Sequence, residues 1–157
     1  MAEPTAESVF ARHQRDIYRY VLRMTGRPDV ADDLRQEVFL RVVHALRNGG
    51  SVGHERGWVF SIARNLVIDR KRDWLRLATP LDAVVEPSRN ATQALAFGLD
   101  EALATLPDDD REVFLMKEVA GLRYDEIAAT CGCTVDSVRS RLFRTRSQLR
   151  RLLAPLG

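Results

Sequence analysis

Apolar residues recur along the chain with the period of an α-helix, and no strand-like alternation persists anywhere. The spacing predicts helices over residues 5–25, 30–47, 55–77, 94–105, 109–120, 124–131 and from 135 almost to 155. Residues 78–94 contain two prolines and no helical stripe, which is typical of a flexible linker. We therefore expect an all-α fold of two small helical domains, over residues 5–77 and 95–154, joined by that linker.

The last predicted helix follows a short helix and a turn at Gly132, which is the order of elements in a helix-turn-helix unit. One face of this helix is apolar and is expected to pack around Ile127; it holds Val135, Val138, Leu142, Leu149 and Leu152. The opposite face holds Ser140, Phe143 and Arg144, with Arg139 at its margin. Arginine can contact guanine edges or phosphates and an aromatic ring can contact a thymine methyl, so this face suits the major groove of DNA. A solvated amphipathic helix is the alternative interpretation.

The distribution of charge supports an anionic partner for this last helix. The formal net charge is only +2, but residues 82–118 hold nine acids and three bases, whereas residues 134–153 hold six arginines and one acid. A surface helix that only keeps a protein in solution would normally mix both signs. Segregation of this kind indicates that the basic segment binds an anion such as nucleic acid.

The third predicted helix combines apolar residues on more than one face with a basic end. Its candidate nucleic-acid-binding residues are Trp58, Arg64, Asn65, Arg70 and Lys71. Basic side chains beside an amide and an aromatic ring suit a single strand, whose bases can stack and offer their edges for hydrogen bonding. The alternative is that Trp58 belongs to the hydrophobic core.

The second predicted helix has a regular inward stripe and an outer face that is both apolar and acidic. Asp33, Gln36 and Glu37 lie on or beside that face, together with Phe39 and Leu40. Such a mixture indicates a protein partner with a basic groove. The alternative is that Phe39 and Leu40 pack against another helix of the same domain.

Several classes of function are disfavoured by the sequence. The apolar runs are far shorter than a membrane span and the N-terminus lacks the apolar segment of a signal peptide, so we expect a cytoplasmic location and no membrane insertion. Cys131 and Cys133 have no second Cys or His pair nearby, which favours small buried residues over a zinc site. The three histidines share no motif and the acids at 108–110 resemble a helix cap and a solvated turn, so we expect no metal, no cofactor and no catalysis.

Three motifs occur in one order along the chain: DDLRQEVFLRV at 32–42, RGWVFSIARNLVID at 56–69, and LPDDDREVFLMKEVAGLRYDEIAATCGCTVDSVRSRLFRTRSQL at 106–149. Together they resemble the extracytoplasmic-function (ECF) sigma factors of bacterial RNA polymerase, over about residues 8–153. The resemblance implies two helical domains, region 2 and region 4. It also implies binding to core polymerase, promoter recognition, transcription initiation and, for this family, control by an anti-sigma protein.

The resemblance implies a role for each cluster of residues. Asp33, Gln36 and Glu37 would bind the clamp helices of the largest polymerase subunit, while the flap of the second largest would be a further contact. Asn65, with Arg64 nearby, would capture a flipped base of the non-template strand at the −10 element, from a loop or irregular turn that splits 55–77 into two helices. The face with Arg139, Ser140, Phe143 and Arg144 would read the −35 duplex, and the acidic linker would lie along the RNA-exit path.

Three positions depart from the family pattern. Gly57 stands where housekeeping sigma factors have one of two aromatics that wedge the duplex open, so only Trp58 remains. Arg123 stands where a Ser or Thr commonly caps the short helix, and Asp136 stands where a small residue is common near the start of the recognition helix. An ordinary dimeric helix-turn-helix regulator stays open as an alternative, although it gives Asn65 and the outer face of the second helix no role. A DNA-processing enzyme would need clustered carboxylates that the motifs do not provide.

Overall fold

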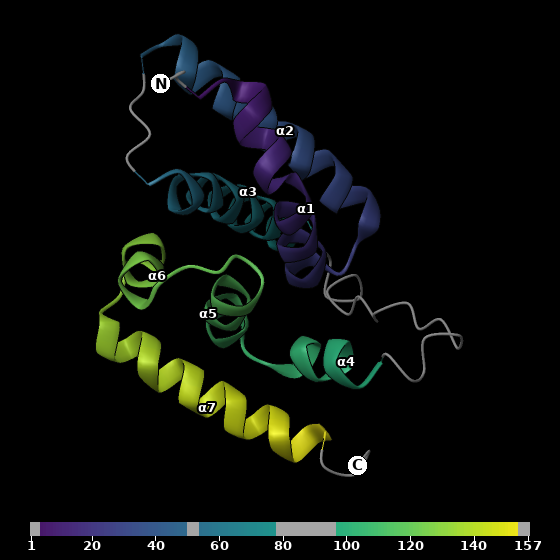
Figure 1. Ribbon diagram of the computed structural model, residues 1–157. Helices are drawn as coiled ribbons and strands as arrows, with labels where there is room; N and C mark the ends of the chain where they lie inside the picture. Colours follow the sequence, from purple (N-terminus) through teal and green to yellow (C-terminus); the bar gives the residue numbers. More distant parts are fainter. Residues whose placement is uncertain (1–3, 50–53, 78–96, 154–157) are drawn as a thin grey trace.

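The structure is a computed structural model that describes residues 4–49, 54–77 and 97–153. Its helices are α1 (Ala6–Thr25), α2 (Pro28–Arg47), α3 (Glu55–Leu77), α4 (Phe97–Thr105), α5 (Asp108–Glu118), α6 (Tyr124–Cys131) and α7 (Val135–Leu153). Helices α1–α3 form one bundle, and α4–α7 form a second group in which α5 lies between the bundle and α7 (Figure 1). The all-α prediction is confirmed, and no strand occurs in the described ranges. The expected linker, 78–94, lies outside them.

Local hydrogen bonds explain where several helices begin and end. The Thr5 hydroxyl accepts from the Ser8 N–H at 3.1 Å and the Ser8 hydroxyl accepts from the Thr5 N–H at 3.0 Å, so α1 starts with a reciprocal cap. Gly26, with φ of 71°, ends α1 in the left-handed conformation that favours glycine. At α6 the Arg123 N–H donates to the Glu126 carboxylate at 2.9 Å. The cap that we expected to be lost at Arg123 is therefore partly replaced.

Helix α5 begins differently from the prediction. The sequence predicted a helix over 109–120 with a cap among the acids at 108–110, but the helix begins at Asp108 directly after Pro107 and has no side-chain cap. Three aspartates thus occupy its first turn, where negative charge is favoured by the helix dipole. Glu112 accepts a hydrogen bond from Arg64 of α3.

The predicted inward stripes form the core. Ala45 of α2 was also expected to point inward and is only half-buried. The other expected inward residues of α1 and α2 are buried: Val9, Ile17, Val21, Met24, Val30, Leu34, Val38 and Val42. In α7 the buried members are Val138, Leu142 and Leu149, whereas Leu152 is 42% exposed. The prediction for Leu152 was wrong because it lies beyond Leu149, the last buried residue of the helix.

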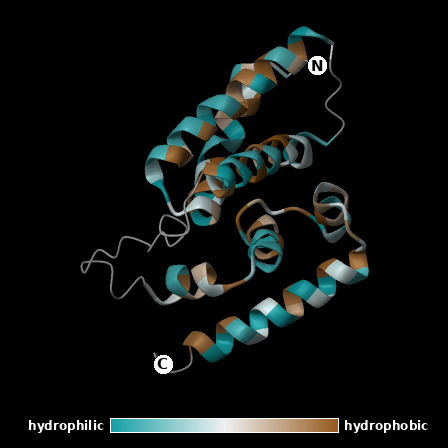
Figure 2. Ribbon diagram, turned by 180° about the vertical axis from the view of Figure 1, so that it is seen from behind, coloured by the Kyte–Doolittle hydropathy of each residue, from teal (hydrophilic) through white to brown (hydrophobic). Residues whose placement is uncertain are grey.

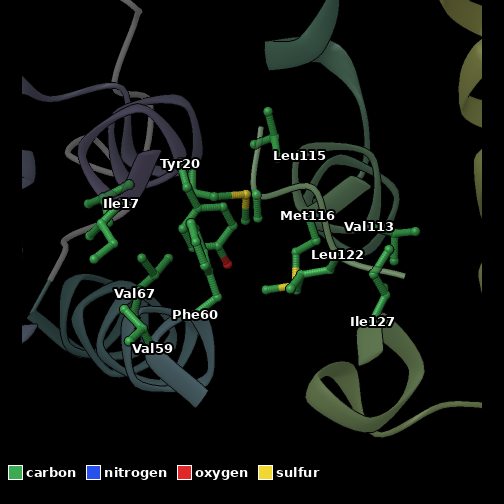
Figure 3. Close-up of a cluster of buried hydrophobic side chains, with 14 of the residues drawn as sticks. Ile17, Tyr20, Val59, Phe60, Val67, Val113, Leu115, Met116, Leu122 and Ile127 are labelled. Atoms are coloured by element: carbon green, nitrogen blue, oxygen red, sulfur yellow. The ribbon is translucent and has the colours of Figure 1, made fainter. Parts of the chain in front are cut away.

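The two groups of helices share a continuous hydrophobic core (Figure 3). Tyr20 of α1 and Phe60 of α3 meet edge to face, with ring centroids 5.8 Å apart, and they point toward Met116 of α5 and Leu122 (Figure 3). All four side chains are fully buried. Burial of this apolar surface favours a closed arrangement of the two groups over two separated ones.

Helix α3 is a single helix of 23 residues, Glu55–Leu77. The division into two helices implied by the family resemblance is therefore wrong for this structure, and Asn65 lies in the middle of the helix rather than in a loop. Val59, Phe60, Ala63, Leu66 and Val67 are buried on more than one face, as the apolar pattern predicted. The helical periodicity of residues 55–77 predicted this single helix correctly, whereas the family resemblance implied two.

Candidate nucleic-acid interface

Helix α7 presents the outward face that the sequence predicted. Arg139, Ser140, Phe143 and Arg144 are all exposed. Phe143 is 75% exposed, although its neighbour Leu142 is only 1% exposed. Hydrophilic and hydrophobic residues follow one another in bands along this helix (Figure 2). The Phe143 ring therefore adds little to the packing of the fold and is available for contact with another molecule.

The turn before α7 fixes this helix on α6. Gly132 has a φ of 66°, and its N–H donates to the Ala128 carbonyl to end α6. The Thr134 hydroxyl then accepts from the Ser137 N–H at 3.0 Å, which caps the start of α7. Two capped helices joined by so short a turn form a rigid helix-turn-helix unit.

The two cysteines flank this turn, where both are half-buried free thiols. Cys131 lies 3.9 Å from the Met116 sulfur, and burial raises its pKa to about 12. Because the thiolate is the reactive and metal-binding form, such a thiol acts as a small packing residue. Within the described ranges no group of three or more His, Cys, Asp or Glu side chains could hold a metal ion.

The arginines of α7 are partly neutralised by α5, which the sequence reasoning missed. Arg144 donates to the Asp110 carboxylate at 3.1 and 2.8 Å. Arg146 lies 3.3 Å from Glu118, which is also on α5. The signal was the concentration of acids in 108–118, of which we interpreted those at 108–110 as a helix cap and a solvated turn.

The basic side chains of α3 also meet α5. Arg64 donates to Glu112 at 2.9 and 3.2 Å, and the pair is largely buried, with 6% of the Glu112 side chain exposed. Lys71 lies 3.2 Å from Asp108. Of the five candidate residues on α3, only Asn65 is exposed, and the other four are half-buried. In this arrangement the acids of α5 form ion pairs with Arg64 and Lys71, two of the cations that we expected to bind a single strand.

Trp58 is half-buried and lines a groove between α3 and α6. His54 and Ser61 lie on the α3 side of this groove, and Asp125 and Glu126 lie on the α6 side. A Cβ at Gly57 would lie 3.6 Å from the Glu126 carboxylate, which is an ordinary van der Waals contact with the end of a side chain of α6.

The outer face of α2 is exposed and mixed, as predicted. Asp33 and Gln36 are exposed, and the Glu37 side chain is 45% exposed, 3.7 Å from Arg41. Asp33 accepts from Arg70 of α3 at 2.9 Å, so the acidic face of α2 adjoins the basic end of α3.

The two apolar residues of this face differ in their surroundings. Phe39 packs on Phe10 with ring centroids 4.9 Å apart, which confirms the packing alternative for that residue. Leu40, however, is 59% exposed. The packing alternative therefore fails for Leu40, which stays in solvent beside the carboxylates of this face.

Comparisons with known proteins agree with this architecture. Family models described as Sigma-70 region 2 and Sigma-70 region 4 match residues 9–76 and 97–149. The chain is 34% identical to ECF RNA polymerase sigma factor SigE of Mycolicibacterium smegmatis, over 98% of this chain and 63% of that protein, so it spans somewhat less than two thirds of that relative. It is 32% identical to ECF RNA polymerase sigma factor SigC of Mycobacterium tuberculosis, over 91% of this chain and 80% of that protein.

Two solved structures share the fold. One is the sigma factor RpoE in complex with the anti-sigma factor NepR from Bartonella quintana, with a TM-score of 0.79 and 24% identity over 94% of this chain and 96% of that one. The other is CnrH in complex with the cytosolic domain of CnrY, with a TM-score of 0.74 and 25% identity over 97% of this chain and 89% of that one. None of the described helices combines the length and the apolarity needed to cross a bilayer. The matches over both helical groups show that the chain belongs to the family of ECF RNA polymerase sigma factors.

Proposed function

We propose that this chain is a dissociable specificity subunit of bacterial RNA polymerase, which binds the core enzyme and directs it to promoters. The polymerase performs the chemistry, so we assign no enzymatic activity to the chain, and we place it in the cytoplasm with its polymerase. The observation that carries the proposal is the outward face of α7, where Phe143 is 75% exposed among arginines on a helix-turn-helix unit. The domain division at 5–77, 78–94 and 95–154 remains a prediction within this proposal.

Helix α7 would enter the major groove at the −35 element. Arg139 and Arg144 would contact guanine edges or phosphates, Ser140 can donate or accept, and Phe143 can pack on a thymine methyl. Exposure of all four side chains supports this assignment. Asp136, whose side chain is 93% exposed and lies 3.8 Å from Arg139, would keep phosphates away from the first turn and favour base contacts there.

The exposed side of α3 would bind the non-template strand at the −10 element. Asn65 is exposed and carries both a donor and an acceptor for the edge of an unpaired base, and Trp58 offers a ring for stacking. Arg64 and Lys71 are bonded to Glu112 and Asp108 in the closed arrangement. We therefore infer that α5 separates from α3 when the chain engages polymerase and promoter.

The polymerase would be bound through α2, and the geometry suggests how this is linked to DNA binding. Asp33, Gln36 and Glu37 offer acidic and amide groups beside the exposed Leu40, a surface suited to the clamp helices of the largest subunit. The flap of the second largest subunit would bind the 97–153 group. Because Asp33 accepts from Arg70, capture of Asp33 by polymerase would release a cation for DNA.

We also propose that an anti-sigma protein controls this chain. Of the two solved structures with the same fold, RpoE is bound to the anti-sigma factor NepR, and CnrH is bound to the cytosolic domain of CnrY. A protein that holds the two groups of helices together would keep Arg64 and Lys71 on α5. The exposed face of α2 would be covered at the same time if that protein overlapped the polymerase contact.

Footprinting on a promoter with and without core polymerase tests the proposal against an ordinary helix-turn-helix regulator. We expect protection of the −35 and −10 elements only when core polymerase is present. Arg144→Ala should weaken promoter-specific run-off transcription about tenfold or more, because a bidentate base contact is lost, while co-purification with polymerase is unchanged. Full protection by the chain alone, or run-off transcription that is indifferent to Arg144→Ala, would contradict the assignment.

A further inference from the structure

Asp110 is a nearly buried carboxylate that supports the exposed Arg144. The Arg144 Nε lies 3.1 Å from Oδ2 of Asp110 and Nη2 lies 2.8 Å from Oδ1, so both carboxylate oxygens are used in a fork. The Asp110 side chain is 5% exposed, whereas the Arg144 side chain is 59% exposed. The pair joins the first turn of α5 to the middle of α7, 34 residues away in sequence. The Asp110 carboxylate is therefore held inside the protein, while the Arg144 guanidinium that it binds lies at the surface.

The strength of this support follows from the burial of Asp110. A carboxylate removed from water must be paired or hydrogen-bonded, and a two-point pair with arginine satisfies both oxygens. The N-terminal turn of α5 adds the favourable field of the helix dipole. Thr145, the next residue of α7, is fully buried, so the helix is packed into the fold directly beside Arg144. Arg144 is therefore held both at its backbone and at its guanidinium.

The fork leaves one edge of the guanidinium free. Arginine has five N–H donors, and Asp110 takes Nε–H and one hydrogen of Nη2. Nη1 contacts no acceptor among the described residues, so an N–H of Nη1 and the second N–H of Nη2 form a parallel pair on the adjacent, terminal edge. Such a parallel pair is what bidentate recognition of guanine O6 and N7 requires.

We propose that Asp110 is a positioning residue for promoter reading: it holds the free edge of the Arg144 guanidinium toward the base edges of the −35 duplex. This inference rests on the proposed function. Without Asp110 the long side chain would sample many rotamers and reach phosphates as readily as bases. Removing the carboxylate also removes a negative charge near the DNA, which favours sequence-independent binding. Asp110 therefore serves discrimination between sequences more than total affinity.

Selection from a promoter library with a randomised −35 element, using holoenzyme assembled from core polymerase and the full chain, tests this inference. Arg144→Ala first identifies the base position that this arginine reads. Asp110→Asn and Asp110→Ala should lower the base preference at that same position by roughly fivefold, with total binding unchanged or stronger. The double variant Asp110→Ala with Arg144→Ala should be no worse than Arg144→Ala alone. Arg144→Lys, which keeps the charge and loses the fork, should lose the preference whether or not Asp110 is present.

Asp109→Ala is the matched control, because Asp109 lies in the same helical turn, is exposed, and makes no ion pair with another described residue. It should leave the preference unchanged. Thermal unfolding of each variant shows whether a loss reflects misfolding, and Asp110→Asn retains a side chain of the same shape for that reason. An unchanged preference in both Asp110 variants, or additive losses in the double variant, would overturn the positioning role alone. If Arg144→Ala alters no −35 position, both this inference and the assignment of α7 fail.

Discussion

At the scale of the single residue, Glu55 ties the start of α3 to α1. Its carboxylate accepts from Arg12 Nε at 2.9 Å and lies 2.7 Å from Nε2 of the buried His13. The hydrogen bond from Arg12 lowers the pKa of Glu55 from 4.5 to about 2; burial opposes this shift and the bond to His13 adds to it. The carboxylate is therefore more acidic in the folded chain than in the unfolded one, and ionisation stabilises the fold.

The sign of this effect predicts a pH dependence. Because the folded pKa of Glu55 is depressed, its contribution is fully present above pH 4.5 and is lost as the pH falls toward 2. Urea unfolding of the native chain and of Glu55→Gln should therefore differ in free energy at pH 6 and converge between pH 4.5 and 2. Asp73→Asn, at an exposed position of α3 away from its first turn, should match the native chain throughout. A constant difference between native chain and Glu55→Gln across this range would show that the carboxylate charge has no part in stability.

At the scale of the element, α7 separates its packing side from its binding side. The two sides follow from helical spacing, which is why Arg139, Ser140, Phe143 and Arg144 could be placed outward from the sequence. Their partners could not be placed in this way. Asp110 and Glu112 reach Arg144 and Arg64 only because α5 lies between α3 and α7, and helical spacing carries no information about how distant helices pack (Figure 1).

The neighbours Leu142 and Phe143 provide a matched test of this division. Leu142→Ala removes a side chain that is 1% exposed and should lower the free energy of unfolding by about 2–5 kcal/mol, because it leaves a cavity. Phe143→Ala removes a side chain that is 75% exposed and should change stability by less than about 0.5 kcal/mol. The same Phe143 variant should weaken −35 recognition. Urea denaturation and promoter binding measure the two effects, and a large loss of stability in Phe143→Ala would place the ring in the fold instead.

At the scale of the whole molecule, the two groups of helices close on each other. The buried Arg64–Glu112 pair and the core around Tyr20 and Met116 hold α3 and α1 against α5 (Figure 3). The sequence predicted two helical domains and the residues on each surface, but gave no sign of their contact, since ion pairs between segments 48 residues apart leave no periodic pattern. In the closed arrangement the acids of α5 form ion pairs with Arg64 and Lys71, the cations that we propose to bind the −10 strand.

Weakening the central ion pair should shift the molecule toward an open form. Glu112→Gln leaves Arg64 with a neutral partner in a buried site, which is strongly unfavourable for the closed arrangement. We expect a larger radius of gyration by small-angle X-ray scattering. Glu118→Gln, which alters the half-exposed pair with Arg146 inside the 97–153 group, is the control and should leave the radius unchanged. Equal radii for the Glu112→Gln and native chains would show that this pair does not hold the groups together.

The most direct test of the whole account is run-off transcription by core RNA polymerase that has been freed of other sigma factors, on a library of promoter fragments. Addition of this chain should start transcripts at a defined set of sites that share −35 and −10 sequences, and Arg144→Ala should reduce them. Polymerase that initiates nowhere when the chain is supplied without any inhibitor would contradict the central claim.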